Sequence, residues 1–168
     1  MTNPKPLLVL GATGKQGKKL ISTILASSSK DSFTILALTR NPESASAKSL
    51  AAKSSTIKLI KGDLDDVPAV FNAALEATNG EKIWGVFCVL LPAQNSTTQD
   101  REVKQGKDMV DGAVANDVQG MRFQCQLAMT WPSPELCNMF WAQVVFSAYL
   151  RVSRLALQNL SYLSDTDY

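Results

Sequence analysis

The sequence predicts an α/β fold in which a Rossmann-like parallel sheet of four strands carries flanking helices. Two observations predict this fold. Short apolar runs alternate with amphipathic stretches between residues 6 and 91, and a glycine-rich turn follows the first run. Strands that alternate with helices at this spacing form βαβ units with right-handed crossovers. The expected strand order is 3-2-1-4.

Four short segments are the expected strands. Each is a mainly apolar run, as is typical of strands that are buried on both faces. In chain order they are Leu7–Leu10, Phe33–Thr39, Thr56–Ile60 and Trp84–Leu91. Gly11 ends the first run and Pro92 stops the last, so both boundaries are marked in the sequence.

Helical periodicity fills the intervals between these strands. Two apolar stripes recur at the spacing of an amphipathic helix, namely Leu20, Ile21, Ile24 and Leu25, and then Val67, Val70, Phe71, Ala74 and Leu75. Asn79–Gly80 is the expected C-cap of the second stripe. A weaker helix, Glu43–Lys53, follows the start signal Pro42, and a last helix covers Thr98–Asn116.

The turn Gly11-Ala-Thr-Gly-Lys-Gln-Gly17 is the strongest functional signal. Gly11 permits the tight turn, Gly14 lets a pyrophosphate approach the backbone, and Gly17 lets the helix pack closely on the strand. Free N–H groups and the positive end of the helix dipole would then hold the diphosphate. An ordinary strand-to-helix turn is the alternative, but the βαβ context favours dinucleotide binding.

Arg40 is the second functional signal, because it follows the expected second strand. An NAD-specific site usually places a carboxylate there for the ribose hydroxyls, whereas here no carboxylate precedes Glu43. A guanidinium can bind a 2′-phosphate in a bidentate contact and stack on adenine. The position favours NADP over NAD, and a solvated surface arginine is the alternative.

The third signal is the acidic loop Gly62-Asp63-Leu64-Asp65-Asp66, after the third strand. Asp63 could accept a hydrogen bond from the adenine amino group. The rival interpretation is helix capping, since one of these aspartates precedes Val67 and carboxylates favour helix N-termini. Both roles are compatible if Asp63 binds and Asp65 or Asp66 caps.

Composition excludes several classes of function. The chain has 168 residues, no histidine and a formal net charge of +2, so neither a histidine-based site nor the basic surface of a nucleic-acid binder is expected. Cys88, Cys125 and Cys137 form no CxxC pair, which favours free thiols and no metal site. The first apolar run is too short for a signal peptide, so we expect a cytoplasmic protein without a membrane partner, and nuclear access stays open.

Together these segments resemble the NmrA-like family, whose members are atypical relatives of the short-chain dehydrogenases. GATGKQG, LTRNP, KGDLDD, the GVFCVL strand and the EVKQGK helix occur in the family's order and roughly at its spacing. The resemblance covers residues 6 to about 118. It implies a Rossmann fold that discriminates among dinucleotides, in proteins that are either redox sensors and transcriptional co-regulators or NAD(P)H-dependent oxidoreductases.

The resemblance also implies the cofactor-binding residues. The diphosphate loop would be Gly11 to Gly17, with Thr13, Lys15 and Gln16 among its members. Arg40 would bind the 2′-phosphate, Asp63 and Leu64 would border adenine, and Leu90–Pro92 would end near the nicotinamide. Lys104 matches a family lysine that reaches the cofactor, and a solvated helix lysine is the alternative. The implied cofactor-binding residues are Gly11, Thr13, Gly14, Lys15, Gln16, Gly17, Arg40, Asp63, Leu64 and Lys104.

No catalytic residue is predicted. Short-chain dehydrogenases use a Tyr-x-x-x-Lys pair, in which the lysine lowers the tyrosine pKa. Here Ser153 stands four residues after Tyr149, and no lysine follows Lys107. The expected function is therefore an NADP(H)-binding, redox-responsive regulatory module or a truncated fragment, with a protein partner conceivable. The alternative is an NAD(P)H-dependent oxidoreductase of the NmrA-like and isoflavone-reductase-like type.

The expected division is a half-domain at residues 1–119 and a divergent tail at 120–168 with one helix, Glu135–Leu160. Residues 120–125 fit no fifth strand in this interpretation, which leaves one edge of the fourth strand exposed. A retained intron or mis-predicted gene model is one hypothesis, because the codons of Gly120–Arg122 can contain GTATG, a common fungal intron start. A genuine divergent regulator with a new C-terminal helix is the other.

Overall fold

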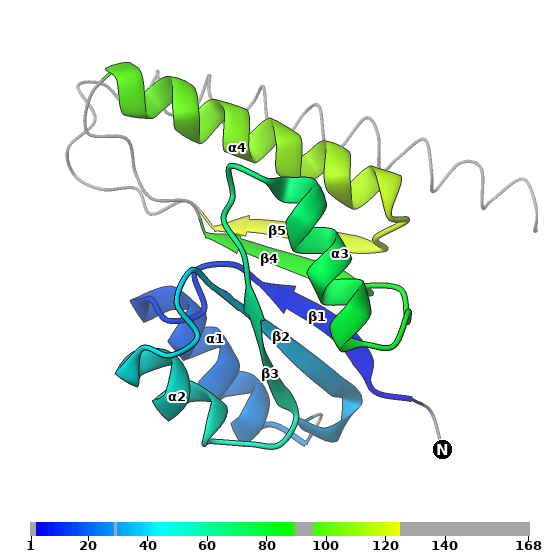
Figure 1. Cartoon of the computed structure of the whole chain (residues 1–168). Coiled ribbons are helices and arrows are strands. Elements are labelled where there is room, and N and C mark those ends of the chain that lie inside the picture. The colour runs from blue at the N-terminus through cyan, green and yellow to red at the C-terminus, as the bar shows by residue number, and fades with distance from the viewer. Residues whose placement is uncertain (1–2, 29, 90–95, 125–168) are drawn as a thin grey trace, which may run out of the picture. The chain divides into compact units, whose positions relative to one another are not determined.

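The computed structural model describes residues 3–28, 30–89 and 96–124, and it contains one parallel sheet with helices on both faces (Figure 1). The strands are β1 Lys5–Val9, β2 Phe33–Thr39, β3 Ile57–Lys61, β4 Gly85–Val89 and β5 Gly120–Gln124. Their order is β3-β2-β1-β4-β5. The predicted α/β class, the parallel sheet and the order of the first four strands are confirmed.

The fifth strand corrects the expectation of a four-stranded sheet. β5 pairs in parallel with β4, from Gly85 opposite Gly120 to Val89 opposite Gln124, so β4 is not an edge strand. The reason for the wrong prediction is the sequence pattern. Apolar Met121 and Phe123 alternate with polar Arg122 and Gln124, whereas the other strands are mainly continuous apolar runs. The predicted helix at 135–160 lies outside the described residues.

The helices agree with the predicted periodicity to within a few residues. They are α1 Lys15–Ala26, α2 Ala45–Ala51, α3 Val67–Ala77 and α4 Ser96–Ala115, with a short 3-10 helix η1 at Lys30–Ser32 before β2. Ser44 rather than Pro42 marks the start of α2, because its side chain accepts a hydrogen bond from Ala47 N at 3.2 Å. Asn79 and Gly80 both have positive φ, and Gly80 N donates to Leu75 O, which confirms the predicted cap of α3.

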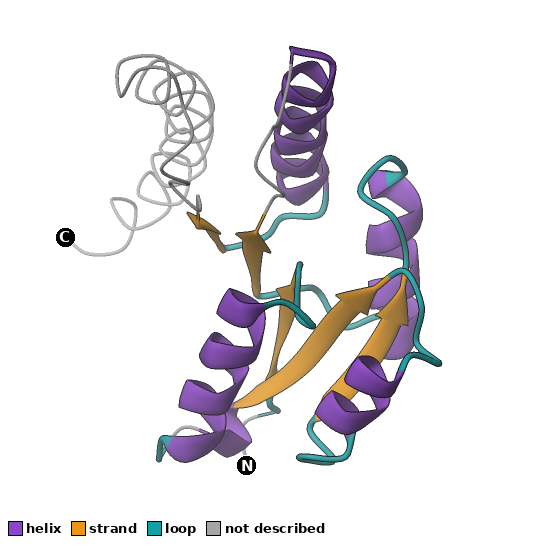
Figure 2. Ribbon diagram, turned by 90° about the vertical axis from the view of Figure 1, so that its left-hand side faces the viewer, coloured by secondary structure: helices purple, strands orange, loops and turns teal. Residues whose placement is uncertain are grey.

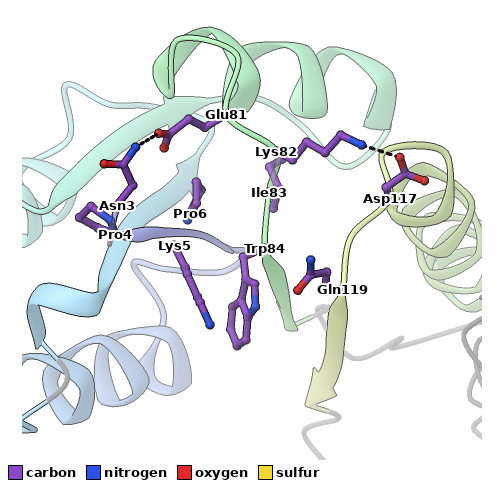
Figure 3. Close-up of a pocket in the computed structure, with 10 residues that line it drawn as sticks. All are labelled: Asn3, Pro4, Lys5, Pro6, Glu81, Lys82, Ile83, Trp84, Asp117 and Gln119. Atoms are coloured by element: carbon purple, nitrogen blue, oxygen red, sulfur yellow. Dashed lines mark hydrogen bonds and ion pairs between the residues drawn. The ribbon is translucent and has the colours of Figure 1, made fainter. Parts of the chain in front are cut away.

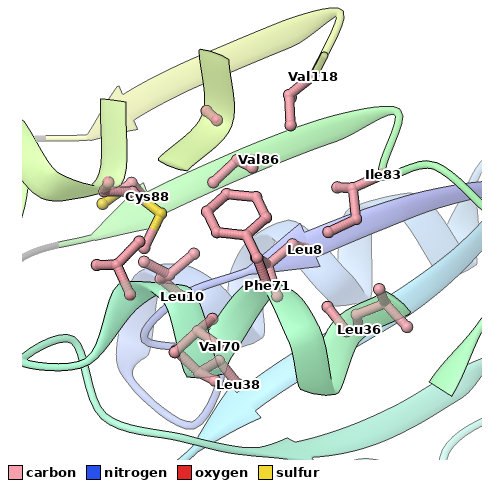
Figure 4. Close-up of a cluster of buried hydrophobic side chains, with 14 of the residues drawn as sticks. Leu8, Leu10, Leu36, Leu38, Val70, Phe71, Ile83, Val86, Cys88 and Val118 are labelled. Carbon is pink, nitrogen blue, oxygen red and sulfur yellow. The ribbon is translucent and has the colours of Figure 1, made fainter. Parts of the chain in front are cut away.

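Alternate residues of the central strands face two separate cores. Leu8, Leu10 and Leu36 pack with α3 and α4 around Phe71, which is 1% exposed (Figure 4). On the opposite face, Val9 and Ile35 pack with α1 and α2. The two cores hold the strands rigidly from both sides, so that the loops leaving their carboxyl ends start from fixed positions.

A glycine lets the two helices of the first core approach each other. A Cβ at Gly112 of α4 would lie 2.7 Å from side-chain carbons of both Phe71 and Val67 of α3. Any side chain at this position would therefore force Phe71, Val67 or α4 itself to shift.

Candidate functional site

The predicted binding segments meet at one edge of the sheet, because every strand is parallel and their carboxyl ends lie together (Figure 2). The glycine turn follows β1, Arg40 follows β2, and the acidic loop follows β3. Gly62 N donates to Thr39 O at 3.2 Å, which links the second and third of these segments. The predicted nicotinamide end of the fourth strand, residues 90–92, lies outside the described residues.

The glycine turn has the tight geometry that its sequence predicted. Gly11 has φ of 65°, and a Cβ there would lie 3.2 Å from Val89 Cβ of β4. A Cβ at Gly17 would lie 2.4 Å from Gly11 O and 2.6 Å from Ala12 Cα, so no side chain fits. Gly14 N donates to Gly11 O at 2.9 Å, which closes the turn.

The N-terminus of α1 has donors that no side chain caps. Gly14 is exposed and forms the N-cap without a side-chain hydrogen bond, and the first turn carries no acidic residue. The backbone bond from Lys18 N to Gly14 O begins the hydrogen bonding of the helix, so the N–H groups of Lys15, Gln16 and Gly17 precede it. Helix N-termini of this kind bind anions.

Gln16 carries a polar atom that needs a partner. Its Oε1 is buried, and among the described residues it accepts no hydrogen bond. Buried polar atoms in proteins are almost always paired, and an unpaired one indicates a missing donor. Thr13, on the same turn, is half-buried. The open helix end and the unpaired amide oxygen fit a dinucleotide at this turn.

Arg40 is exposed, and within the described residues its side chain has no hydrogen bond or ion pair. The loop around it is ordered by Asn41, whose Oδ1 accepts from Glu43 N at 3.0 Å. Glu43, the first carboxylate after β2, forms an ion pair with Lys48 at 2.7 Å. The guanidinium therefore remains available for an anion.

The three aspartates of the acidic loop have three different roles. Asp66 caps α3 by accepting from Ala69 N at 3.1 Å, as one of the two predicted capping candidates. Asp65 instead accepts hydrogen bonds from Arg101 and from Gln105 of α4. Asp63 is exposed, with its Oδ1 accepting from Asp65 N at 3.2 Å, while Leu64 packs against the core.

Arg101 and Gln105 were not predicted by any motif. Their spacing of four residues places both on one helix face, but nothing in the sequence indicates which loop this face meets. The hydrogen bond from Arg101, followed by that from Gln105, lowers the pKa of Asp65 below its ordinary value. The carboxylate of Asp65 is thus held in its charged form.

Lys104 lines a groove between α3 and α4. Its Nζ forms an ion pair with Asp108 at 2.5 Å, which raises the pKa of Lys104. The groove encloses about 570 Å³ and also contains Asp65 and Phe71 in its lining. The role of Lys104 as a cofactor ligand stays a prediction.

A second hollow, of about 240 Å³, lies at the opposite end of the sheet, where β1, β4 and β5 begin (Figure 3). Two pairs of polar groups lie in its lining, Lys82 with Asp117 at 2.8 Å and Asn3 with Glu81 at 2.8 Å, while the exposed side chain of Gln119 has no hydrogen bond to the described residues. Lys5 Nζ lies 5.0 Å from the centre of the Trp84 ring, at cation–π distance. The charged groups of this hollow therefore all have a partner within the described residues.

Other kinds of site are not found in the described part of the chain. Those residues contain no group of three or more side chains that could hold a metal ion. Of the helices at these positions, none is both long and apolar enough to cross a bilayer. Cys88 is completely buried, and burial raises the pKa of its thiol. A buried neutral thiol is not a nucleophile.

Comparisons with known proteins agree with this geometry. The model of the NmrA-like family matches residues 3–126. An NmrA-like family domain-containing oxidoreductase, ptmS, from Penicillium ochrochloron is 28% identical over 134 residues, which cover 77% of this chain and 37% of that protein.

Two solved structures share the fold. Triphenylmethane reductase of Citrobacter sp., in complex with NADP(H), has a TM-score of 0.59 at 19% identity, covering 88% of this chain and 45% of that one. The Bordetella bronchiseptica enzyme WbmG, in complex with NAD, has a TM-score of 0.53 at 15% identity, covering 71% and 37%. The chain spans less than half the length of these relatives. Because the fold accommodates both dinucleotides, it does not by itself select NADP.

Proposed function

The chain belongs to the NmrA-like family, and from this premise we propose that its described domain binds NADP(H) as the cofactor-binding part of an NAD(P)H-dependent oxidoreductase. The observation that carries the proposal is the uncapped N-terminus of α1 beside the closely packed glycine turn. Two similar proteins support it, since ptmS is an NmrA-like family domain-containing oxidoreductase and the structure of triphenylmethane reductase contains NADP(H).

Each binding residue has a distinct task in this proposal. The N–H groups of the first turn of α1 bind the diphosphate, and Gly14 leaves room for it. Arg40 binds the 2′-phosphate through its guanidinium, as a bidentate charge-assisted contact. Asp63 accepts from the adenine amino group, and Gln16 Oε1 accepts from a donor of the ligand. When bound, NADPH supplies a hydride for reduction.

The proposed diphosphate-binding turn, Gly11 to Gly17, is tested by replacing Gly14 with valine. The branched side chain would occupy the space of the diphosphate, and its Cβ would also lie 3.1 Å from Gly11 O. We expect calorimetry to detect no NADPH binding by Gly14→Val, with helical content unchanged by circular dichroism. Gly120→Val is the matched control, because a Cβ at Gly120 meets nothing within 4 Å. Unchanged affinity for NADPH in a folded Gly14→Val protein contradicts the proposal that this turn binds the diphosphate.

A redox-responsive binding module is the second candidate, and the missing Tyr-x-x-x-Lys pair favours it. Tyr149 is followed four residues later by Ser153, so the usual proton donor has no lysine beside it. A binding module predicts that the chain binds NADPH but does not oxidise it with ketone, quinone or enone acceptors. Absorbance at the reduced-nicotinamide band measures this directly. The oxidoreductase is supported instead if the purified protein oxidises NADPH and if substitution of a residue of this chain abolishes that activity.

A further inference from the structure

The acidic loop after β3 is tied to α4 through one carboxylate. Arg101 binds Asp65 with two donors, Nε to Oδ1 at 3.0 Å and Nη2 to Oδ2. Gln105 Nε2 adds a third hydrogen bond to Asp65 Oδ1 at 2.7 Å. A single exposed ion pair is weak, but a bidentate guanidinium with an additional amide donor restricts the carboxylate to one geometry.

Asp65 transmits this restraint to the neighbouring aspartate. Its backbone N–H donates to Asp63 Oδ1, which fixes the orientation of the Asp63 side chain. On its other side, the loop is anchored where Asp66 caps α3. Gly62 N, hydrogen-bonded to Thr39 O, anchors its beginning to the end of β2. The loop therefore has restraints on three sides, and α4 provides one of them.

We propose that Arg101 and Gln105 are positioning residues that make the site selective for adenine. By holding Asp65, they keep Asp63 oriented to accept a hydrogen bond from the exocyclic amino group of the base. A hypoxanthine base presents a carbonyl oxygen at the same place, which a carboxylate repels. This inference rests on the proposed binding of NADP(H), and it adds which side chains outside the binding motifs determine base selectivity.

The experiment compares two ligands that differ only at this edge of the base: NADPH and its deamino analogue, in which hypoxanthine replaces adenine, so that the amino group becomes a carbonyl and N1 gains a proton. The variant is the double substitution Arg101→Met with Gln105→Leu, which removes all three donors to Asp65 and introduces no new one. Lys82→Gln is the matched control, because it breaks an exposed lysine–aspartate pair of the same domain at the opposite end of the sheet. Calorimetry measures the affinity of each protein for each ligand.

We expect the wild type to bind NADPH more tightly than the analogue. The double variant should lose about fivefold to tenfold in NADPH affinity, as for one hydrogen bond, and less than about twofold for the analogue. Lys82→Gln should retain the wild-type preference. The single Arg101→Lys variant, which keeps the charge, should lose part of it.

The remaining outcomes overturn the inference in distinguishable ways. Equal losses for both ligands mean that Arg101 and Gln105 only stabilise the domain, and unchanged affinity for both means that they do not position the site. A wild type without preference between the ligands excludes the contact of Asp63 with the amino group. A wild type that binds neither ligand refutes the proposed function itself.

Discussion

The two ends of the parallel sheet differ in how their polar groups are satisfied. At the amino ends of the strands, Lys82 pairs with Asp117, Asn3 with Glu81, and Lys5 lies over Trp84. At the carboxyl ends, Arg40 has no partner among the described residues, and neither has Gln16 Oε1. Among the described residues, the charged groups around the hollow at the amino ends thus have partners, whereas Arg40 and Gln16 Oε1 have none at the carboxyl ends, where parallel sheets bind ligands.

The most severe steric change tests the close packing at the carboxyl end of the sheet. Gly17→Ala places a Cβ against the backbone atoms Gly11 O and Ala12 Cα, which cannot rotate away. We expect a loss of about 1–3 kcal/mol in the free energy of unfolding, as for other overpacked sites. Urea denaturation measures it.

Gly120→Ala is the control for this substitution, because its new methyl group points into open space. If Gly17→Ala were as stable as Gly120→Ala, the close packing of α1 on the turn would not hold in solution.

A change of charge at Arg40 tests the choice between the two cofactors. If Arg40 binds the 2′-phosphate, Arg40→Ala should weaken NADPH binding by about 1.5–3 kcal/mol, or roughly one to two decades in affinity. NADH lacks this phosphate, so its affinity should hardly change. Raised salt should weaken NADPH binding more in the wild type than in the variant. Calorimetry on two proteins with two cofactors measures the difference.

The control is Lys30→Ala, which removes an exposed cation just before the amino end of the same strand, β2. It should leave both affinities unchanged. Equal losses for NADPH and NADH in Arg40→Ala would assign the guanidinium to loop support or adenine stacking. No loss of affinity for either cofactor would mean that Arg40 is a solvated surface side chain without contact to the ligand.

The sequence was sufficient for the features that local chemistry determines. Gly11, Gly17 and the Asn79–Gly80 cap were predicted because positive φ or a missing Cβ leaves few alternatives to glycine. The fifth strand was missed because its apolar and polar residues alternate, and because no local residue pattern indicates that this segment pairs with β4. The bond between Asp65 and Arg101 joins residues 36 apart in sequence, so only the packing of α4 reveals it.

The contact of Gly11 with Val89 has a consequence for the order of folding. β1 pairs with β2 across a short crossover, whereas its pairing with β4 brings Leu7 against Gly85 and must close a much longer loop. Closing longer loops costs more chain entropy and slows the formation of the contact. The β1–β2–β3 half can therefore assemble first, while the glycine turn lacks the neighbour that it packs against. During synthesis, the segment with the ligand-binding backbone would be translated before β4, and it would acquire its final shape only after β4 has paired with β1.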